Sequence, residues 1–589
     1  MPPNSTAHAE PNDDLLGHPR GLFTLFFAEL WERFSYYGMR ALLTLYMVAP
    51  LASGGLNFPT ERAVIIYGTY TMSVYMLSIP GGTIADSLLG ARASVLWGGM
   101  IIACGHFCMA IPTETTFFLG LVLIVLGTGL LKPNISAMVG GLYRQGDPRR
   151  DAGFSIFYMG INIGAFTSPL VTGFLAQHSA FKSILTSWGM NPAHSWHWGF
   201  GAAGVGMVFG LAVFVAFAKN LRDVGGPPTR APGAWKTPLL AMIGTLGLWA
   251  VATLSDRPGF TWLRLLFILV PIGIMLWFGF SKDSEIRKIG AIFYFFVGAF
   301  IFWALFEQAG SSLNLFADRF TQTHIFGVEF PSSWYQSANP LFVILLAPVC
   351  AILWMKLGDR QPSSPMKFTI GLFFLTAAFG LMFPAAKLAA AGRVSPLWLL
   401  GLYLLQTIGE LCLSPVGLST FTKLSQPGSF FQLLAARLVS AEFEWSSLSA
   451  GYRLKMPALS LGAVVAAPLA MRLVLSARPH LRSAALYSGV VMAVIVAYSY
   501  WYFWLHLTMW TRHFQPALYS GLGLLVYWGS WLYRIRLQPQ AGMARRLQLA
   551  LVLLLALQTV LVWRVPLLEP GTSFARGCTD LGGPSCMRP

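Results

Sequence analysis

The chain has 589 residues, of which 55% are hydrophobic and 11% are charged, and its mean hydropathy is +0.60. Soluble domains carry about 25% charged residues, so the composition excludes a soluble globular protein and predicts an all-α polytopic membrane protein embedded in a lipid bilayer. The net charge of +17 does not indicate a nucleic-acid partner, because residues 427–589 alone hold 14 basic and four acidic side chains.

Hydrophobic runs of membrane-spanning length follow one another along the chain. The first six predict helices at about 21–51, 62–88, 93–112, 116–142, 152–178 and 199–218. A polar piece rich in proline and glycine comes next, with two further runs at about 238–254 and 260–280. Four more follow at about 288–317, 333–357, 367–390 and 396–423. Six helices, a linker with an inserted pair and a second set indicate two packed bundles with a site between them.

The N-terminus and the loops predict how the chain enters the membrane. Residues 1–20 are polar and lack the basic-then-apolar order of a cleaved signal peptide. Positive charges gather in particular loops, such as the one that holds Arg144, Arg149 and Arg150. By the positive-inside rule, the N-terminus is expected to be cytoplasmic. The six cysteines show no paired spacing, so neither a disulfide framework nor a metal or other cofactor is expected.

The stretch ELWERFSYYGMR, residues 29–40, lies inside the first hydrophobic run. At 100° per residue, its polar residues fall on one arc of roughly 140°; they are Glu29, Glu32, Arg33, Tyr36, Tyr37 and Arg40. Each charge at membrane depth costs about 3 kcal/mol, so four on one face need protein or water opposite them. A soluble helix with Glu29 and Arg33 as a surface i,i+4 pair is disfavoured by the apolar flanks. This face is predicted to line a polar cavity.

Three further polar features interrupt apolar runs. Lys132 lies deep in a run broken by glycine and proline, although a lysine can also extend to the membrane interface. Asn162 is an amide among apolar residues, where it needs a partner. Glu307 and Glu410 are carboxylates in the second set of helices. A buried carboxylate is costly unless it is paired or neutralised, so each is a candidate site residue, with structural helix pairing as the alternative.

These residues together resemble the proton-dependent oligopeptide transporter family of the major facilitator superfamily. The most specific motifs are residues 29–38, which fit the family's ExxERFxYYG, and residues 157–164. The resemblance covers about residues 17–426 and implies a major facilitator fold, with two six-helix bundles and an extra helix pair between them. The chain then divides into an N-terminal tail (1–20), a first bundle (21–219), a linker with the inserted pair (220–284), the first four helices of a second bundle (285–426) and an atypical C-terminal region (427–589).

The resemblance implies a proton-coupled symporter that imports di- and tripeptides through the cell membrane, and a monomer is expected. It implies proton coupling for Glu29, Glu32, Arg33, Arg40, Lys132 and Glu307. It implies peptide contacts for Arg33, Tyr36, Tyr37, Arg40, Tyr75, Lys132, Asn162, Trp303, Gln308, Asn339, Glu410 and Ser414. The cationic side chains would hold the peptide carboxylate, and Glu410 would hold the ammonium group.

Several alternatives stay open. From Pro427 the sequence contains no asparagine, and thirteen arginines stand against one lysine. A shifted reading frame, a fused end and a divergent genuine end all fit this change. The chain could also transport another small anion or be a non-transporting, inactive family member. Glu29 and Glu32 beside Arg33 favour the peptide. An enzyme is not expected, because the sequence shows neither a His/Cys metal cluster nor a nucleophile with a base nor a phosphate loop.

Overall fold

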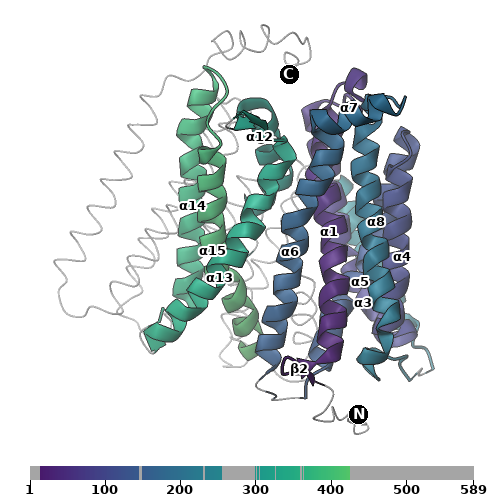
Figure 1. Ribbon diagram of the computed structural model, residues 1–589. Coiled ribbons are helices and arrows are strands. Elements are labelled where there is room, and N and C mark those ends of the chain that lie inside the picture. The colour runs from purple at the N-terminus through teal and green to yellow at the C-terminus, as the bar shows by residue number, and fades with distance from the viewer. Residues whose placement is uncertain are drawn as a thin grey trace, which may run out of the picture. The chain divides into compact units, whose positions relative to one another are not determined.

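The computed structural model describes residues 14–144, 147, 149–229, 232–254, 299, 302–303, 305–325, 327–358, 361–362 and 364–424. The predicted helix at 260–280, most of the run at 288–306 and the atypical region 427–589 lie outside these residues. Within them the chain is helical apart from loops and two short hairpins (Figure 1). Eight of the described helical segments are long and apolar enough to cross a membrane. The prediction of an all-α polytopic membrane protein is confirmed.

The helices follow the predicted order, with bounds set by proline, glycine and polar residues. They are α1 (Arg20–Val48), α2 (Thr60–Met76), α3 (Ser78–Ile84), α4 (Ala91–Met109), α5 (Glu114–Gly141), α6 (Arg150–Gln177), α7 (Ser179–Ser187), α8 (Ser195–Ala216), α9 (Lys236–Leu254), α12 (Ser312–Phe320), α13 (Ala338–Leu357), α14 (Ser364–Ala389) and α15 (Leu397–Leu424). A single π-turn, η3 (Ala85–Leu89), follows α3, and short 3-10 turns include η5 (Ala218–Leu221), η7 (Glu307–Gly310) and η8 (Ser332–Ser337).

Three local features differ from the predicted runs. The single helix expected at 62–88 is interrupted at Leu77, and α3 passes so close to α5 that a Cβ on Gly81 would lie 2.0 Å from the Gly129 carbonyl oxygen. The run expected as one helix to about 317 is broken by the 3-10 turn η7 and the non-helical Ser311, and α12 then extends to Phe320. The sequence also gave no signal for α7 or for the two hairpins, β1 (Asp14–Leu15) with β2 (His18–Pro19) and β3 (His324–Ile325) with β4 (Val328–Glu329), because elements this short show no readable periodicity.

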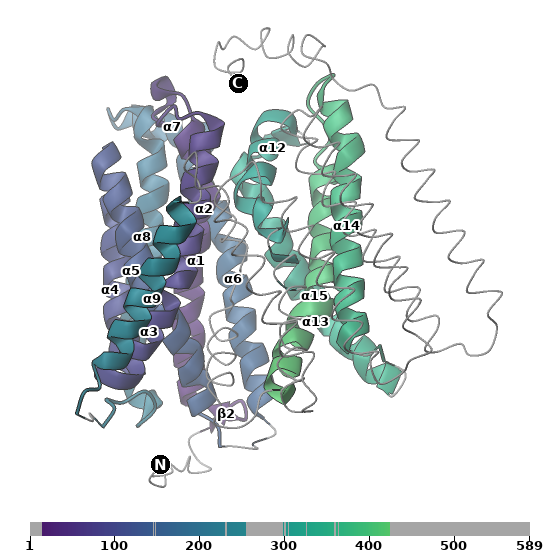
Figure 2. The ribbon, with the colours of Figure 1, turned by 180° about the vertical axis from the view of Figure 1, so that it is seen from behind.

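The described residues fall into two compact units. The first contains residues 14–254 and Glu307–Val349, and the second contains the described residues of 299–306 and those from Cys350 to 424. In the first unit, α1, α4, α5, α6 and α8 lie side by side (Figure 1). Seen from behind, α9 runs along α3, and the Trp249 indole N–H donates to Ser73 Oγ at 3.1 Å (Figure 2).

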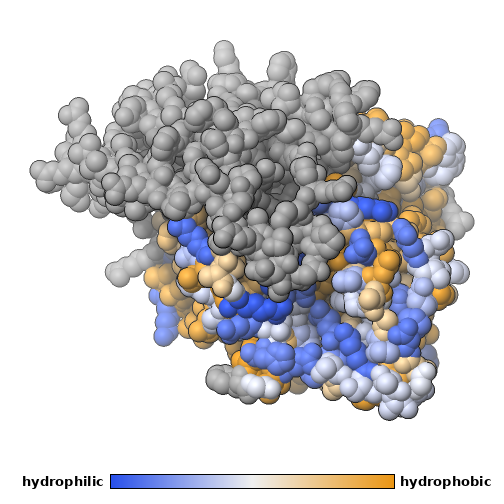
Figure 3. Space-filling view, turned by 90° about the horizontal axis from the view of Figure 1, so that it is seen from above, coloured by the Kyte–Doolittle hydropathy of each residue, from blue (hydrophilic) through white to orange (hydrophobic). Residues whose placement is uncertain are grey.

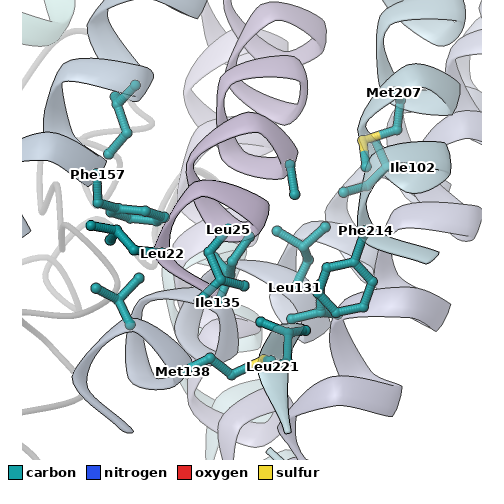
Figure 4. Packing of buried hydrophobic residues seen from close by; sticks show 14 of the residues in the cluster. Leu22, Leu25, Ile102, Leu131, Ile135, Met138, Phe157, Met207, Phe214 and Leu221 are labelled. Atoms are coloured by element: carbon teal, nitrogen blue, oxygen red, sulfur yellow. The ribbon is translucent and has the colours of Figure 1, made fainter. Parts of the chain in front are cut away.

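Apolar side chains from five helices and η5 form a buried cluster in the first unit (Figure 4). The labelled members are Leu22 and Leu25 of α1, Ile102 of α4, Leu131, Ile135 and Met138 of α5, Phe157 of α6, Met207 and Phe214 of α8, and Leu221 of η5. In Figure 3, hydrophilic residues gather on the described surface at the end of the molecule that carries α7. An end of this kind is suited to water, whereas the apolar helix sides are suited to lipid.

Glycines let neighbouring helices touch through their backbones, as is typical of helix pairs in membranes. In the first unit, a Cβ on Gly98 of α4 would lie 2.6 Å from the Gly127 carbonyl oxygen of α5. In the second unit, a Cβ on Gly409 of α15 would lie 2.7 Å from the Gly371 carbonyl oxygen of α14. These contacts fix the α4–α5 and α14–α15 pairs.

The start of α1 is held by contacts from the β1–β2 hairpin to the loop between α5 and α6. Arg149 Nη1 donates to Asp14 Oδ2 at 2.6 Å, and Arg149 Nη2 donates to Asp147 Oδ2 at 3.0 Å. The hydrogen bonds from Arg149 lower the pKa of the Asp147 carboxyl. Because a lowered pKa favours the ionised form, this contact is lost only as the pH falls through that lowered value.

We predict that Gly127→Ala lowers the thermal midpoint of the purified protein by several degrees. Its new Cβ would lie 2.5 Å from the Gly98 carbonyl oxygen, and backbone atoms cannot give way as a flexible side chain would. Overpacking of this kind costs about 1–3 kcal/mol. Gly244→Ala on α9 is the matched control, because its Cβ would meet no atom within 4 Å. Equal effects of the two substitutions would contradict the backbone-contact explanation.

Candidate functional site

The polar face predicted on α1 is buried inside the first unit. Glu29, Glu32, Arg33 and Arg40 are each at least 96% buried. Arg33 Nε lies 3.0 Å from Glu29 Oε1, one helical turn away, and also bonds the Glu32 carboxylate. Two carboxylates therefore share one guanidinium, which balances much of the charge that burial in the membrane would otherwise penalise.

Two tyrosines stack against the arginines of this face. The Arg33 guanidinium lies 5.1 Å from the Tyr36 ring centre, and that of Arg40 lies 5.4 Å from the Tyr37 ring centre. The two rings meet edge to face, with their centres 5.2 Å apart. Such cation–π contacts stabilise a guanidinium while leaving some of its N–H groups available for other partners. The aromatic and cationic residues of the stretch thus form one layer along α1.

Arg40 forms the second ion pair of the site. Its Nη1 lies 3.2 Å from Glu307 Oε1, and both side chains are 95% buried. The Tyr67 hydroxyl of α2 donates to Glu307 Oε2 at 3.1 Å. Two backbone contacts lie beside the pair: Thr44 Oγ1 donates to the Gly310 carbonyl at 2.7 Å, and Asn314 Nδ2 donates to the Ala41 carbonyl at 2.9 Å. Together these contacts attach η7 and α12 to α1.

Lys132 is also buried, at the point where α5 carries an internal proline. Its Nζ donates to the Tyr75 hydroxyl at 3.4 Å and lies 4.4 Å from the Tyr75 ring centre. Because this ammonium group is buried, Lys132 does not extend to the membrane interface. The structure thus brings Lys132 together with Tyr75.

Asn162 of α6 is buried, and its Nδ2 donates to the Tyr158 carbonyl at 2.9 Å. Gly164, one half-turn further on, allows α6 to approach α1, since a Cβ there would lie 2.2 Å from the Leu30 carbonyl oxygen. Gln308 lies in η7, where its Oε1 accepts a hydrogen bond from Ser312 Oγ at 2.7 Å. Asn339 lies in the first turn of α13.

The remaining predicted site residues lie in the second unit. Trp303 is half-buried, and its ring centre lies 5.0 Å from that of Phe306. Glu410 of α15 is 94% buried, near the buried polar side chains of Gln406 and Thr407. Ser414 belongs to the same helix, but its side chain lies outside the described residues.

Sequence reasoning missed Tyr67 as a site residue. Tyr67 and Tyr75 are eight residues apart in the run predicted as one helix at 62–88, so helical spacing placed both on one face. The structure adds that Gly310 makes room for this side chain, because a Cβ there would lie 2.1 Å from the Tyr67 hydroxyl. Thr44 and Asn314 gave no signal, because single hydroxyl and amide side chains in apolar runs have many roles.

The fold and the buried charged layer define a membrane transporter. A protein family model, the POT family, matches residues 92–457. The chain belongs to this family. The matched part extends about 30 residues beyond the segment on which the sequence resemblance rested.

Relatives and solved structures agree with this membership. The chain is 43% identical to "Uncharacterized transporter YclF" of Bacillus subtilis, over 71% of this chain and 84% of the relative. It is 41% identical to "Peptide transporter YePEPT" of Yersinia enterocolitica, over 69% of this chain and 82% of the relative. A "Di-/tripeptide transporter" of Lactococcus lactis is 38% identical, over 71% and 86%. The family and these relatives are transporters rather than enzymes.

The solved structures describe the fold. A crystal structure of the peptide transporter POT in complex with alafosfalin matches with a TM-score of 0.66 and 37% identity, over 88% of this chain and 96% of the other. A POT family transporter in complex with 5-aminolevulinic acid matches with a TM-score of 0.63 and 31% identity, over 83% and 96%. This likeness confirms the predicted major facilitator fold.

We predict that Arg40 and Glu307 stabilise the protein only as a pair. Glu307→Ala should lower the free energy of unfolding by about 3 kcal/mol, because it leaves a buried guanidinium without its counter-ion. Adding Arg40→Leu should recover much of that loss. Unfolding in mixed micelles, analysed as a double-mutant cycle, measures the coupling.

The exposed pair of Arg62 and Glu114, whose charged atoms lie 3.6 Å apart, is the matched control. Both of its side chains are more than half exposed, so its coupling should stay below about 1 kcal/mol. A coupling between Arg40 and Glu307 no larger than that of the control pair would show that burial does not strengthen the contact.

Proposed function

We propose that the protein is a proton-coupled symporter that imports di- and tripeptides by alternating access. The observation that carries this proposal is the α1 layer, in which Arg33 is shared by Glu29 and Glu32 while Arg40 pairs with Glu307. The similarity to the peptide transporters of Yersinia enterocolitica and Lactococcus lactis supports the peptide class of substrate. The arrangement combines groups that bind an anion with carboxylates that can take up a proton.

A short peptide is a zwitterion, so its transporter needs a cationic pole, an anionic pole and room for variable side chains. Arg33, Arg40 and Lys132 would supply the cationic pole for the carboxylate. Glu410 would supply the anionic pole for the ammonium group. The remaining proposed contacts are polar edges and aromatic walls: Tyr36, Tyr37, Tyr75, Asn162, Trp303, Gln308, Asn339 and Ser414.

The proposed transport cycle uses two helix bundles, residues 21–219 and 285–426, joined by the linker 220–284. The site is exposed to one side of the membrane and then to the other as the bundles rearrange. The N-terminus would be cytoplasmic, the protein would lie in the cell membrane, and a monomer would be the transporting unit. The loop charges near Arg144, Arg149 and Arg150 support this orientation.

Proton coupling would act through the ion pairs. A proton added to Glu307 removes its negative charge, so Arg40 loses its counter-ion and the attachment of η7 to α1 weakens. The released Arg40 can then bind the carboxylate of a peptide, and loss of the proton on the other side restores the pair. Glu29 and Glu32, beside Arg33, are the other carboxylates that could exchange a proton with the substrate pathway.

A second candidate substrate is a small zwitterion shorter than a dipeptide. One similar solved transporter holds 5-aminolevulinic acid, which carries the same two end groups. Proteoliposomes that contain the purified full chain test both candidates. A dipeptide added outside should acidify the lumen, and 5-aminolevulinic acid should do so if the end groups alone suffice. If no peptide acidifies the lumen although the protein is folded, the proposed function is wrong.

We predict that Glu32→Gln and Lys132→Ala each abolish uptake driven by a proton gradient. The first removes one carboxylate of the shared Arg33 pair, and the second removes the buried cation beside Tyr75. Counterflow, which needs binding and reorientation but no gradient, should survive better in Glu32→Gln. The exposed Glu61→Gln is the control and should transport as the unmodified protein does. Full gradient-driven uptake by either site variant would refute its role in coupling.

We also predict that Glu410→Ala weakens the binding of peptides with a free amino terminus more than that of N-acetylated peptides. Only the free terminus is charged, and losing a buried charge partner is worth about 3 kcal/mol. Competition in counterflow with matched pairs of free and acetylated dipeptides measures the difference. Equal losses for the two ligands would remove Glu410 from the amino-terminal pocket.

A further inference from the structure

A seam of hydrogen bonds holds η8 against α6, close to the end of the molecule where α7 lies. The Trp334 indole N–H donates to the Leu170 carbonyl at 3.0 Å, and Ser337 Oγ donates to the Phe166 carbonyl at 2.8 Å. Gln177 Nε2 donates to Ser332 Oγ at 3.0 Å, while its Oε1 accepts the Ser333 N–H at 3.1 Å. We call these contacts the α6–η8 seam.

Glu329 of the β3–β4 hairpin closes the outer end of this seam. Its Oε2 accepts the backbone N–H of Ser179 at 3.0 Å and a short hydrogen bond from Ser179 Oγ. Ser179 is the first residue of α7, so the carboxylate lies at the positive end of a nine-residue helix. A carboxylate there satisfies an N–H group that the helix itself cannot pair.

His178 does not supply the attraction. Its Nδ1 accepts the Ala180 N–H at 3.1 Å, which requires an unprotonated ring nitrogen. The 3.5 Å between His178 Nδ1 and Glu329 Oε2 is therefore an approach of two acceptors rather than an ion pair. Burial alone would raise the pKa of Glu329, but the hydrogen bonds from Ser179 oppose it and the net shift is downward. Because the pKa is lowered, the carboxylate is ionised at neutral pH and the contact would be lost only in acid.

The seam joins parts of the chain that the proposed cycle must separate. Helices α6 and α7 belong to the proposed first bundle, whereas residues 328–337 belong to the proposed second bundle. In the structure these residues pack together in one compact unit. Access to the site from the α7 end requires the two proposed bundles to part there, and therefore requires the seam to open.

We propose that Glu329 is a latch for the α7 end of the transporter: by binding the first turn of α7 it favours the state in which this end is closed. The latch rests on the proposed alternating access. Glu329 is a positioning residue, since it acts on the opening of the path rather than on the substrate. The contact suits this role because its two hydrogen bonds to one charged group are lost together when the hairpin moves away.

Distances between two spin labels test the latch in the full chain. Cysteines at Ser183 of α7 and at Gln322, beside the hairpin, carry the labels in a background whose six native cysteines are replaced; both positions are exposed. Glu329→Ala should raise the population with the longer distance, relative to that with the shorter distance, about tenfold. This is the change expected for losing a hydrogen bond to a charged group. Glu329→Gln keeps an acceptor but loses the charge, so its population ratio should lie between that of the unmodified protein and that of Glu329→Ala.

Two further variants make the result specific. Glu61→Ala removes an exposed carboxylate from the first turn of α2 and should leave the distances unchanged. Ser179→Ala should shift them less than Glu329→Ala, and the double variant should shift them no further than Glu329→Ala alone. A thermal midpoint measured for each variant separates opening from unfolding.

The outcomes are distinct. Distances in Glu329→Ala that match those in Glu61→Ala would overturn the latch. The latch would also be overturned if Glu329→Ala and Ser179→Ala together shifted the distances by the sum of their separate shifts. The distances need neither a substrate nor a proton gradient. A shift in the distances of a protein that fails to move peptides would therefore refute the proposed function and leave the latch intact.

Discussion

The structure depends on placing four charged side chains of one helix where water cannot reach them. Glu29, Glu32, Arg33 and Arg40 are all buried within the first unit. Removing one partner from a buried ion pair costs about 3–5 kcal/mol, so the helices around α1 have to bring the remaining partners to it. Glu307 at Arg40 and the tyrosine rings over both guanidinium groups meet that requirement.

Helix contacts through glycine make such a site possible. Gly164 brings α6 against α1, and Gly310 allows Tyr67 to lie close to Glu307. Backbone contact of this kind holds neighbouring helices close together. It also leaves little freedom for gradual deformation, so the attachment of η7 and α12 to α1 is better suited to switching between two arrangements than to continuous change.

The segment from Glu307 to Ser337 is held to the amino-terminal helices in two chemically different ways. Near α1 the contact is a buried ion pair, whose strength depends on charge and on the absence of water. Near α7 it is a partly exposed carboxylate on a helix N-terminus, supported by the α6–η8 seam. A change of protonation at Glu307 would act on the first directly, whereas the second stays ionised at neutral pH. On the proposed mechanism, the first attachment would respond to protons while the second would set the resting state.

The sequence by itself determined the membrane class, most of the long described helices and the polar face of α1. Hydrophobic runs predicted α1, α4, α5, α6, α8, α13, α14 and α15, because the bilayer requires long apolar helices whose backbone bonds are internal. The polar face of α1 could be predicted because the 100° rotation between successive helical residues is a local property.

Tertiary structure decided which partners those residues have. Tyr67 at Glu307, Tyr75 at Lys132 and Ser179 at Glu329 join residues between 57 and 240 positions apart, and no local pattern specifies such a pairing. The break at Leu77, the short α7 and the hairpins likewise depend on close packing and on turns, which hydrophobic periodicity does not record.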